Sequence, residues 1–382
     1  MVNAHHRQSI QLELRRRYKL CNYCTSRHVT IGKDRWRAAK ADDDKCDICS
    51  GLMKRLDFII KIMKEKVADV YEFDTFLIGA TLPTNVYERE DQIRALLKIR
   101  GKENIKNQFC SELRRKFEFI TKKKIDYLFP DVLISVTVGE ERRVDIIAKA
   151  RSLTLTGRYT KKQRGLPQKQ SKCTQCKGRG CTFCDNSGLS GYESVEGIIG
   201  YRLLCLTKSN AARFSWVGSE DRNSLVSGKG RPFFVTLSNP KVRMLKTSLN
   251  IDTPEISATV KAKPIRVPQS PIRFVTKTKI IVESASTINE NKLKDLILLN
   301  NATIKFRNKK KTIMKKIYSV KTRMIKHNRF LLTLLADGGL AIKNFVSGQQ
   351  YTSPNVSAIV GDRCESVLFD VSDVHTLTSF EF

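Results

Sequence analysis

Four Cys-x-x-Cys pairs constrain this sequence more than any other feature, and they contain eight of its eleven cysteines. The first two pairs are Cys21-x-x-Cys24 and Cys46-x-x-Cys49. Each such turn places two sulfurs about 4 Å apart, which matches one edge of a tetrahedral ZnS4 site. The spacing predicts a structural zinc ion, because four thiolates leave no open position for a catalytic water. His28 lies between the pairs, and we expect an exposed loop histidine there rather than a ligand.

The other two pairs form a compact second cluster. Four thiols fall within twelve residues, and the glycines among them permit tight turns; the thiols are Cys173, Cys176, Cys181 and Cys184. This pattern favours a second zinc site, and the alternative is a reduced or disulfide-linked loop. The three remaining cysteines lie in apolar or mixed contexts, and we expect ordinary core thiols at Cys110, Cys205 and Cys364.

The charge balance indicates the class of partner. Lysine and arginine total 70 against 38 acidic residues, a net charge of +32 over 382 residues. Such a chain repels itself unless a polyanion or salt screens it, so nucleic acid is the first choice of partner and an anionic membrane surface the second. No apolar run reaches the roughly 18 residues of a membrane-spanning helix, and no N-terminal signal pattern is visible. We therefore expect a cytoplasmic protein, with metal sites rather than disulfides, that works as a monomer without an obligatory protein partner.

Hydrophobic spacing predicts an α/β unit over residues 54–150. Helices are expected over 52–67, from Ala80 to Ile99 and over 105–121, and strands over 73–78, 132–138 and 144–148. Farther along, the pattern predicts a short helix over 192–200 and strands over 233–237, 273–283 and 367–374. The chain is long enough for two or three domains of this kind.

Two stretches combine many cations with no acid. Residues 151–184 form a basic connector punctuated by Gly157, Gly165 and Pro167, which is either a phosphate-contacting segment or a solvated linker. Residues 305–329 carry eleven cations with apolar side chains interleaved. In a chain this basic, that density favours a nucleic-acid footprint over a solvated amphipathic face.

The segment 216–240 contains the best candidate for chemistry. Glu220 and Asp221 stand side by side on a loop, and a glycine-bracketed basic turn over 228–232 leads into the predicted strand. A loop before a buried strand can present one carboxylate to a substrate, although a lone acidic pair is more often a polar surface turn. Lys343 lies among apolar neighbours, so we expect it to need a carboxylate partner or a shifted pKa.

The sequence resembles the archaeal and eukaryotic tRNA pseudouridine synthases that carry a THUMP-related N-terminal domain. The family pattern is G-R-E-D-x-D, G-x-G-R-P-F and N-P, against Gly218-Ser-Glu-Asp-Arg-Asn223, Gly228-Lys-Gly-Arg-Pro-Phe233 and Asn239-Pro240 here. The family's G-L-Y-I-K-E-L-I-S-G-D is similar to the segment from Gly339 to Gln349. The connector resembles G-R-Y-x-K-x-x-R-G-x-P-Q, which favours RNA contact.

This resemblance implies a fold and a set of roles. The expected fold is α/β (α+β), with a zinc-binding module over 1–53, a THUMP-related RNA-binding domain over 54–150, the connector with its cysteine cluster over 151–190 and a catalytic domain over 191–382. A central, mainly antiparallel sheet is expected in the catalytic domain. Asp221 would be the catalytic aspartate and Lys343 its cationic partner, with RNA contacts expected at Phe274, Arg158, Tyr159, Arg164 and Arg231. Zinc would be structural, and no organic cofactor is implied.

The implied function is isomerisation of uridine to pseudouridine at positions 54 and 55 in the TΨC arm of tRNA. The sequence departs from the family at Ser219 and Asn223, where the family has Arg and Asp, and at Ala341, where it has Tyr. The family's K-x-Y tyrosine is also missing from residues 277–279, and Phe274 is the nearest aromatic. The alternative function is therefore a zinc-containing tRNA-binding protein with a degenerate, inactive site. A zinc-dependent deaminase is set aside because its H-x-E and P-C-x-x-C elements are missing.

Overall fold

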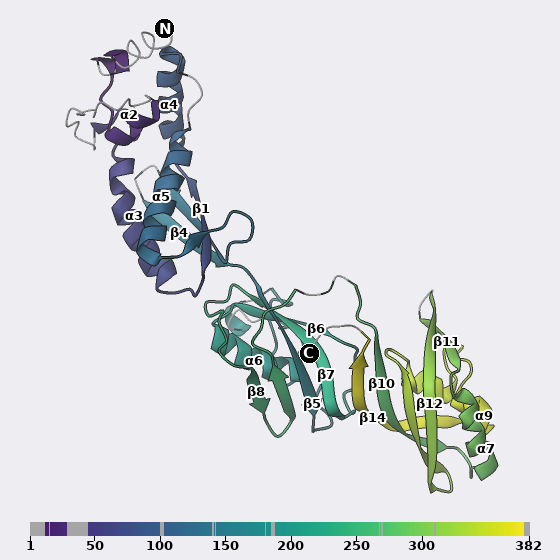
Figure 1. Ribbon diagram of the computed structural model, residues 1–382. Helices are drawn as coiled ribbons and strands as arrows, with labels where there is room; N and C mark the ends of the chain where they lie inside the picture. The colour runs from purple at the N-terminus through teal and green to yellow at the C-terminus, as the bar shows by residue number, and fades with distance from the viewer. Residues whose placement is uncertain are drawn as a thin grey trace. The chain divides into compact units, whose positions relative to one another are not determined.

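The computed structural model describes residues 12–14, 16–28, 45–99, 103–139, 141, 143–179, 181–184, 188–266, 268, 270–308 and 311–377 (Figure 1). The chain forms two compact units, Met1–Arg151 and Ser152–Phe382. Each unit has its own hydrophobic core, so each is described by itself. Among the described residues, no helix is both long and apolar enough to cross a membrane.

The first unit contains a four-stranded sheet in the order β2-β1-β3-β4. Its strands are β1 (Thr75–Thr81), β2 (Lys124–Ile125), β3 (Val132–Val138) and β4 (Val144–Ala150). β1 runs parallel to β2 and β3, and β4 runs antiparallel to β3. Alternate residues of β3 are buried from Val132 onward, so the sheet turns one face to the core.

The helices of this unit follow the predicted periodicity closely. They are α2 (Asn22–His28), η2 (Leu52–Arg55), α3 (Leu56–Met63), η3 (Lys64–Ala68), α4 (Thr84–Leu96) and α5 (Ile105–Thr121). The predicted bounds of α5 are confirmed, and four of its apolar residues, each four positions apart, are fully buried. α4 begins later than predicted because Ala80 belongs to β1 and Pro83 stands just before the first helical residue.

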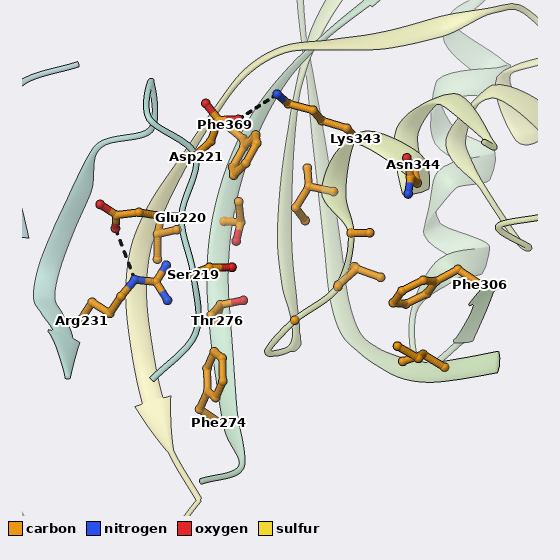
Figure 2. A pocket seen from close by; sticks show the side chains of 17 residues that line it. Ser219, Glu220, Asp221, Arg231, Phe274, Thr276, Phe306, Lys343, Asn344 and Phe369 are labelled. Carbon is orange, nitrogen blue, oxygen red and sulfur yellow. Dashed lines mark hydrogen bonds and ion pairs between the residues drawn. The ribbon is translucent and has the colours of Figure 1, made fainter. Parts of the chain in front are cut away.

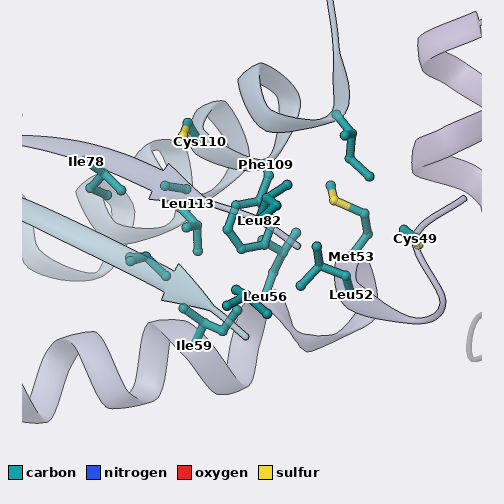
Figure 3. Packing of buried hydrophobic residues seen from close by; sticks show 14 of the residues in the cluster. Cys49, Leu52, Met53, Leu56, Ile59, Ile78, Leu82, Phe109, Cys110 and Leu113 are labelled. Atoms are coloured by element: carbon teal, nitrogen blue, oxygen red, sulfur yellow. The ribbon is translucent and has the colours of Figure 1, made fainter. Parts of the chain in front are cut away.

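One core runs through the whole first unit. Figure 3 shows Leu56 of α3 and Phe109 and Leu113 of α5 packed in the same cluster as Leu52 and Cys49. That cluster also contains the buried residues of β1, β3 and β4. The cysteine-bearing segment and the predicted THUMP-related domain therefore share a core across the expected boundary at residue 53.

The expectation of an exposed loop histidine at position 28 is wrong. His28 lies on α2 and is 5% exposed, with Nδ1 2.6 Å from the carbonyl oxygen of Cys24. The cause is the buried carboxylate of Glu90 on α4, which forms an ion pair with Arg27 and draws α2 inward. Burial lowers the pKa of His28. The expectation of a core thiol is likewise wrong for Cys205, which is exposed.

The second unit contains a ten-stranded sheet in the order β11-β12-β13-β10-β14-β7-β5-β9-β8, with β6 paired to β7. The strands are β5 (Leu153–Lys161), β6 (Ala211–Trp216), β7 (Val226–Ser238), β8 (Leu249–Asp252), β9 (Ile256–Val260), β10 (Phe274–Ser284), β11 (Thr303–Asn308), β12 (Lys311–Lys326), β13 (Arg329–Asp337) and β14 (Cys364–Thr376). Within the described residues of this second sheet, only β14 and β7 pair in parallel, at Val371 and Val226. The prediction of a mainly antiparallel sheet is confirmed.

Two hydrophobic cores form where strands of this sheet pack with helices. One is built from β5, β7, β9 and α6 (Val195–Thr207). The other is built from β10, β12 and β13 with α7 (Glu290–Asp295), η5 (Leu296–Leu299), α8 (Ile342–Ser347) and α9 (Val356–Val360). β10 and β14 join the two halves of the sheet, as Figure 1 shows.

Two predicted loops are strand instead. The start of the basic connector is β5, which pairs with β7 and β9, because Leu153, Leu155 and Tyr159 are buried between its polar residues. The predicted basic turn over 228–232 lies inside β7. Gly228 and Gly230 have φ of 65° and 75°, and a Cβ on them would lie 2.2 Å from the Ser372 carbonyl oxygen and 2.6 Å from that of Tyr159. These glycines let β7 approach β14 and β5 closely.

Candidate active site

A pocket of about 460 Å³ opens where the two halves of the second unit meet. The loop after β6 forms one wall, β10 and β14 form the floor, and α8 and the β11–β12 hairpin form the other wall. The volume lies in the range of small-molecule sites. Asp221 and Lys343 face each other across the rim, as Figure 2 shows.

The structure brings Asp221 and Lys343 together although they lie 122 positions apart in the chain. Lys343 Nζ is 2.7 Å from Asp221 Oδ2, and the backbone N–H of Asn223 donates to Oδ1 at 3.0 Å. The ammonium group, and after it the Asn223 N–H, lowers the pKa of Asp221. Lys343 thus has a carboxylate partner, as expected, but its side chain is not enclosed by apolar neighbours, since α8 directs it outward and leaves it 66% exposed.

Glu220, the neighbour of Asp221, points the opposite way, and its side chain is fully buried. Its carboxylate lies 3.2 Å from Lys161 Nζ and 3.3 Å from Arg231 Nε, and it accepts a hydrogen bond of 2.8 Å from the Tyr159 hydroxyl. Buried charges are stable only when paired and hydrogen-bonded. The two acids therefore have different tasks: Glu220 anchors the loop, and Asp221 faces the pocket.

Lys161 fixes the backbone of this loop from beneath. Its ammonium group donates to three carbonyl oxygens, those of Leu166, Asp221 and Arg222, at 3.0, 3.2 and 3.1 Å. Its positive charge also contributes to the lowered pKa of Asp221. The sequence interpretation missed Lys161, although its place two residues after Tyr159 on an alternating strand puts both on the same buried face.

Two of the residues predicted to contact RNA lie in the interior. Tyr159 and Arg231 are each 1% exposed, and both bind Glu220. Arg231 also donates to the carbonyl oxygen of Val217 at 3.0 Å. Burial, and then the adjacent carboxylate, raises the pKa of Tyr159. Their position makes them supports of the loop that carries Asp221, because a residue at 1% exposure offers no surface to RNA.

The other two predicted arginines are partly exposed and also bind the loop or its neighbours. Arg164 forms a two-pronged ion pair with Asp370 at 2.7 and 2.8 Å, and donates to the Asn223 carbonyl oxygen at 2.7 Å. Asp370 in turn accepts from the Leu225 N–H at 2.9 Å. Arg158 donates to the carbonyl oxygen of Gly230 at 2.9 Å, and partial burial lowers its pKa.

Three phenylalanines line the pocket, Phe274, Phe306 and Phe369, and of these the sequence interpretation named only Phe274 as a site residue. Phe274, the predicted one, is wedged between backbones: a Cβ on Gly218 or Gly338 would lie 2.6 or 2.1 Å from its ring. Phe369 comes from β14, next to the residue that holds Leu225. Figure 2 shows Phe369 beside the Asp221–Lys343 pair and Phe274 at the opposite end of the pocket.

Comparison with known proteins identifies the family. The profile described as "Pus10, C-terminal" matches residues 154–375, more than half of the chain, and "Pus10 THUMP domain, archaeal" matches residues 61–137. This chain belongs to the Pus10 family. It is therefore a pseudouridine synthase with a THUMP domain in its first unit.

Relatives across the archaea support this assignment. The proteins named "tRNA pseudouridine synthase Pus10" from Nitrosopumilus maritimus and Cenarchaeum symbiosum are 33% and 30% identical, covering 95% and 94% of this chain and 96% and 90% of their own length. The one from Methanocaldococcus jannaschii is 32% identical, over 87% of this chain and 76% of its own. A solved structure titled "Crystal structure of pseudouridylate synthase" aligns with a TM-score of 0.22 at 13% identity over 66% of this chain and 82% of that one, too low to bear on function.

The first four-cysteine cluster of this Pus10 protein has the geometry of a metal site. The sulfurs of Cys21, Cys24, Cys46 and Cys49 lie within 4.8 Å of one another, and all four residues are buried. The Cys21 and Cys49 sulfurs are 3.7 Å apart, close to the edge of about 3.8 Å that a Zn–S distance of about 2.3 Å gives a tetrahedron. Arg27 donates to the Cys24 sulfur at 3.5 Å, which supports a thiolate there.

The second cluster is similar. Its four sulfurs also lie within 4.8 Å of one another, with separations of 3.7 Å between Cys176 and Cys184 and 4.0 Å between Cys173 and Cys181. The backbone N–H of Gly188 donates to the Cys184 sulfur at 3.2 Å. Both donor sets fit a zinc ion, which would tie each loop together and take no part in the reaction, because four thiolates complete its coordination.

Replacing one ligand in each cluster tests these assignments separately. We expect Cys24→Ser and Cys176→Ser each to remove the zinc of one cluster, as measured by elemental mass spectrometry of purified protein. Cys24→Ser should also lower the unfolding temperature of the first unit, whose core includes that cluster. Cys205→Ser, at an exposed thiol outside both clusters, is the control. Wild-type zinc content in either ligand variant would contradict the corresponding site.

Proposed function

We propose that this protein converts uridine to pseudouridine in the TΨC arm of tRNA, at position 54, position 55 or both, with Asp221 as the catalytic carboxylate. The observation that carries the proposal is the Asp221–Lys343 pair at the rim of a 460 Å³ pocket. The names of the relatives and the net charge of +32 support tRNA as the substrate.

The chemistry requires an ionised carboxylate. The uracil must leave C1′ of the ribose, turn, and rejoin through carbon, and a carboxylate can start this either as a nucleophile or by abstracting the ribose 2′ proton. Lys343 and the Asn223 N–H hold Asp221 ionised and oriented. The buried network around Glu220 keeps the loop in place during the reaction.

The target base must leave its stack to enter the pocket, which costs a few kcal/mol that protein contacts must offset. Phe369 is placed to stack on that base beside Asp221, and Phe274 supports the loops at the far end. Backbone contacts would come from the basic β11–β12 hairpin, where the exposed cations are Lys305, Arg307, Lys311, Lys316, Lys321, Arg323 and Lys326. We expect one chain to act alone.

A zinc-containing tRNA-binding protein with an inactive site is the second candidate. Ser219 and Asn223 stand where the family has Arg and Asp, and the family's K-x-Y tyrosine is missing. These departures favour the inactive-site candidate. The ionised, hydrogen-bonded Asp221 and the aromatic side chain at position 369 favour an active enzyme instead. The two candidates differ in turnover and not in affinity for tRNA.

The decisive test maps pseudouridine by nucleotide on an unmodified tRNA transcript after incubation with wild type and Asp221→Ala. We expect product in the TΨC arm from the wild type and at least a roughly 10³-fold slower reaction from the variant. Asp91→Ala, at an exposed acid of α4, should match the wild type. Tight binding without product from the wild type would select the inactive-site candidate.

The role of Lys343 is tested by the pH dependence of turnover in the variant Lys343→Met. The pKa of Asp221 is lowered in the folded protein, so Asp221 is charged at neutral pH and loses its charge only as the pH falls through that low value. Lys343→Met should move this acidic limb upward, yet leave Asp221 ionised at neutral pH. We therefore expect turnover to fall about 10- to 100-fold and to stay low between pH 6 and 9. Recovery as the pH rises would show that Lys343 serves ionisation and not orientation.

Phe369 and Phe274 are distinguished by paired leucine substitutions. We expect Phe369→Leu to slow turnover roughly 5- to 100-fold, because an aromatic stack on the base is lost, with little change in unfolding temperature. Phe274→Leu should lower the unfolding temperature, because it leaves a gap against Gly218 and Gly338. Normal turnover by Phe369→Leu would contradict the stacking role.

A further inference from the structure

Tyr351 is a solvent-exposed aromatic residue in a disfavoured conformation. It lies between α8 and α9, and its side chain is 83% exposed. Gln350 and Tyr351 both have φ of 54°, in the left-handed region that residues with a Cβ rarely adopt. Strained, exposed residues persist where the surrounding structure holds them, and such positions gather at sites of function.

The loop that carries Tyr351 is hydrogen-bonded to two elements of the pocket wall, β11 and α8. The Arg307 N–H donates to the Gln350 carbonyl oxygen at 3.1 Å, and Lys305 and Ser353 exchange two backbone hydrogen bonds of 2.9 Å. The Asn344 amide donates to Gln350 Oε1 at 2.8 Å. Asn344 follows Lys343 on α8 and lines the pocket, so the loop that carries Tyr351 is tied to the helix that carries Lys343.

The charged side chains on β11 and α8, the two segments that hold the Tyr351 loop, are all cations. Lys305 and Arg307 are exposed on β11 and alternate with the buried Ile304 and Phe306. No acidic residue occurs from position 338 to position 361. An aromatic face beside cations fits an RNA strand, in which bases stack on the ring and phosphates contact the cations.

We propose that Tyr351 stacks on an unpaired base beside the nucleotide held in the pocket, while Lys305 and Arg307 contact the adjoining phosphates. The proposal rests on the proposed function, because it takes RNA as the substrate. Stacking on a tyrosine tolerates any base, so Tyr351 adds affinity without selecting sequence. Holding the ring in place before binding reduces the ordering cost of the complex.

Substitutions at Tyr351 test this by tRNA binding, measured by fluorescence anisotropy with an unmodified transcript at fixed salt. We expect Tyr351→Ala and Tyr351→Gly to raise the Kd roughly 5- to 100-fold, and Tyr351→Trp to stay close to wild type. Glycine adopts positive φ without steric strain, so Tyr351→Gly should bind tRNA weakly without a loss of thermal stability. Tyr201→Ala, at an exposed tyrosine on α6, is the matched control.

A spectroscopic readout shows the stack itself. With 2-aminopurine on either side of the target uridine, wild-type protein should quench the fluorescence on binding, and Tyr351→Ala should not. Wild-type affinity and quenching in Tyr351→Ala would overturn the proposal. If the wild type forms no pseudouridine but Tyr351→Ala still binds more weakly, the proposed catalysis fails while the stacking role stands.

Discussion

The buried carboxylate of Glu220 forms the interaction on which the candidate active site of this protein depends. It is surrounded by Lys161, Arg231 and Tyr159, which come from β5 and β7. Lys161 and Arg231 face one carboxylate, so one positive charge is left over beneath the loop. The carbonyl oxygens that accept hydrogen bonds from Lys161 help to stabilise this charge. The same arrangement places a positive charge behind Asp221 and favours its ionised form.

Close strand contact makes this network possible. Gly228 and Gly230 allow β7 to approach β14 and β5 at distances that a Cβ would forbid. The loop that carries Asp221 leaves β6 and is bound at its far end by Asp370 of β14. Lys161 therefore holds the backbone of Asp221 directly, and Asp370 holds the end of the loop at Leu225. Such support matters because a carboxylate acts on a bound nucleotide only when held in a narrow range of geometry.

Local pattern predicted part of this structure and could not predict the rest. The four-residue spacing of α5 and the alternation of β3 reflect burial on one face, which a sequence displays directly. The segment from Leu153 to Lys161 alternates as well, but its cations suggested a linker, because sequence does not show that Lys161 meets a buried carboxylate 59 positions away. Phe369 was missed for the same reason: its place beside Asp221 arises from sheet order.

The two adjacent acids Glu220 and Asp221 lie in opposite environments, one buried and one at the pocket. This arrangement persists although the neighbouring positions 219 and 223 differ from the family pattern. Glu220 and Asp221 are consecutive, so fixing the first in the interior forces the second to the other side of the loop. The departures at Ser219 and Asn223 leave this geometry intact, because neither side chain forms the Glu220 network and position 223 contributes its backbone N–H to Asp221. What those departures alter is the exposed surface of the loop. The Glu220 network and the Asp221–Lys343 pair are thus compatible with a changed loop surface.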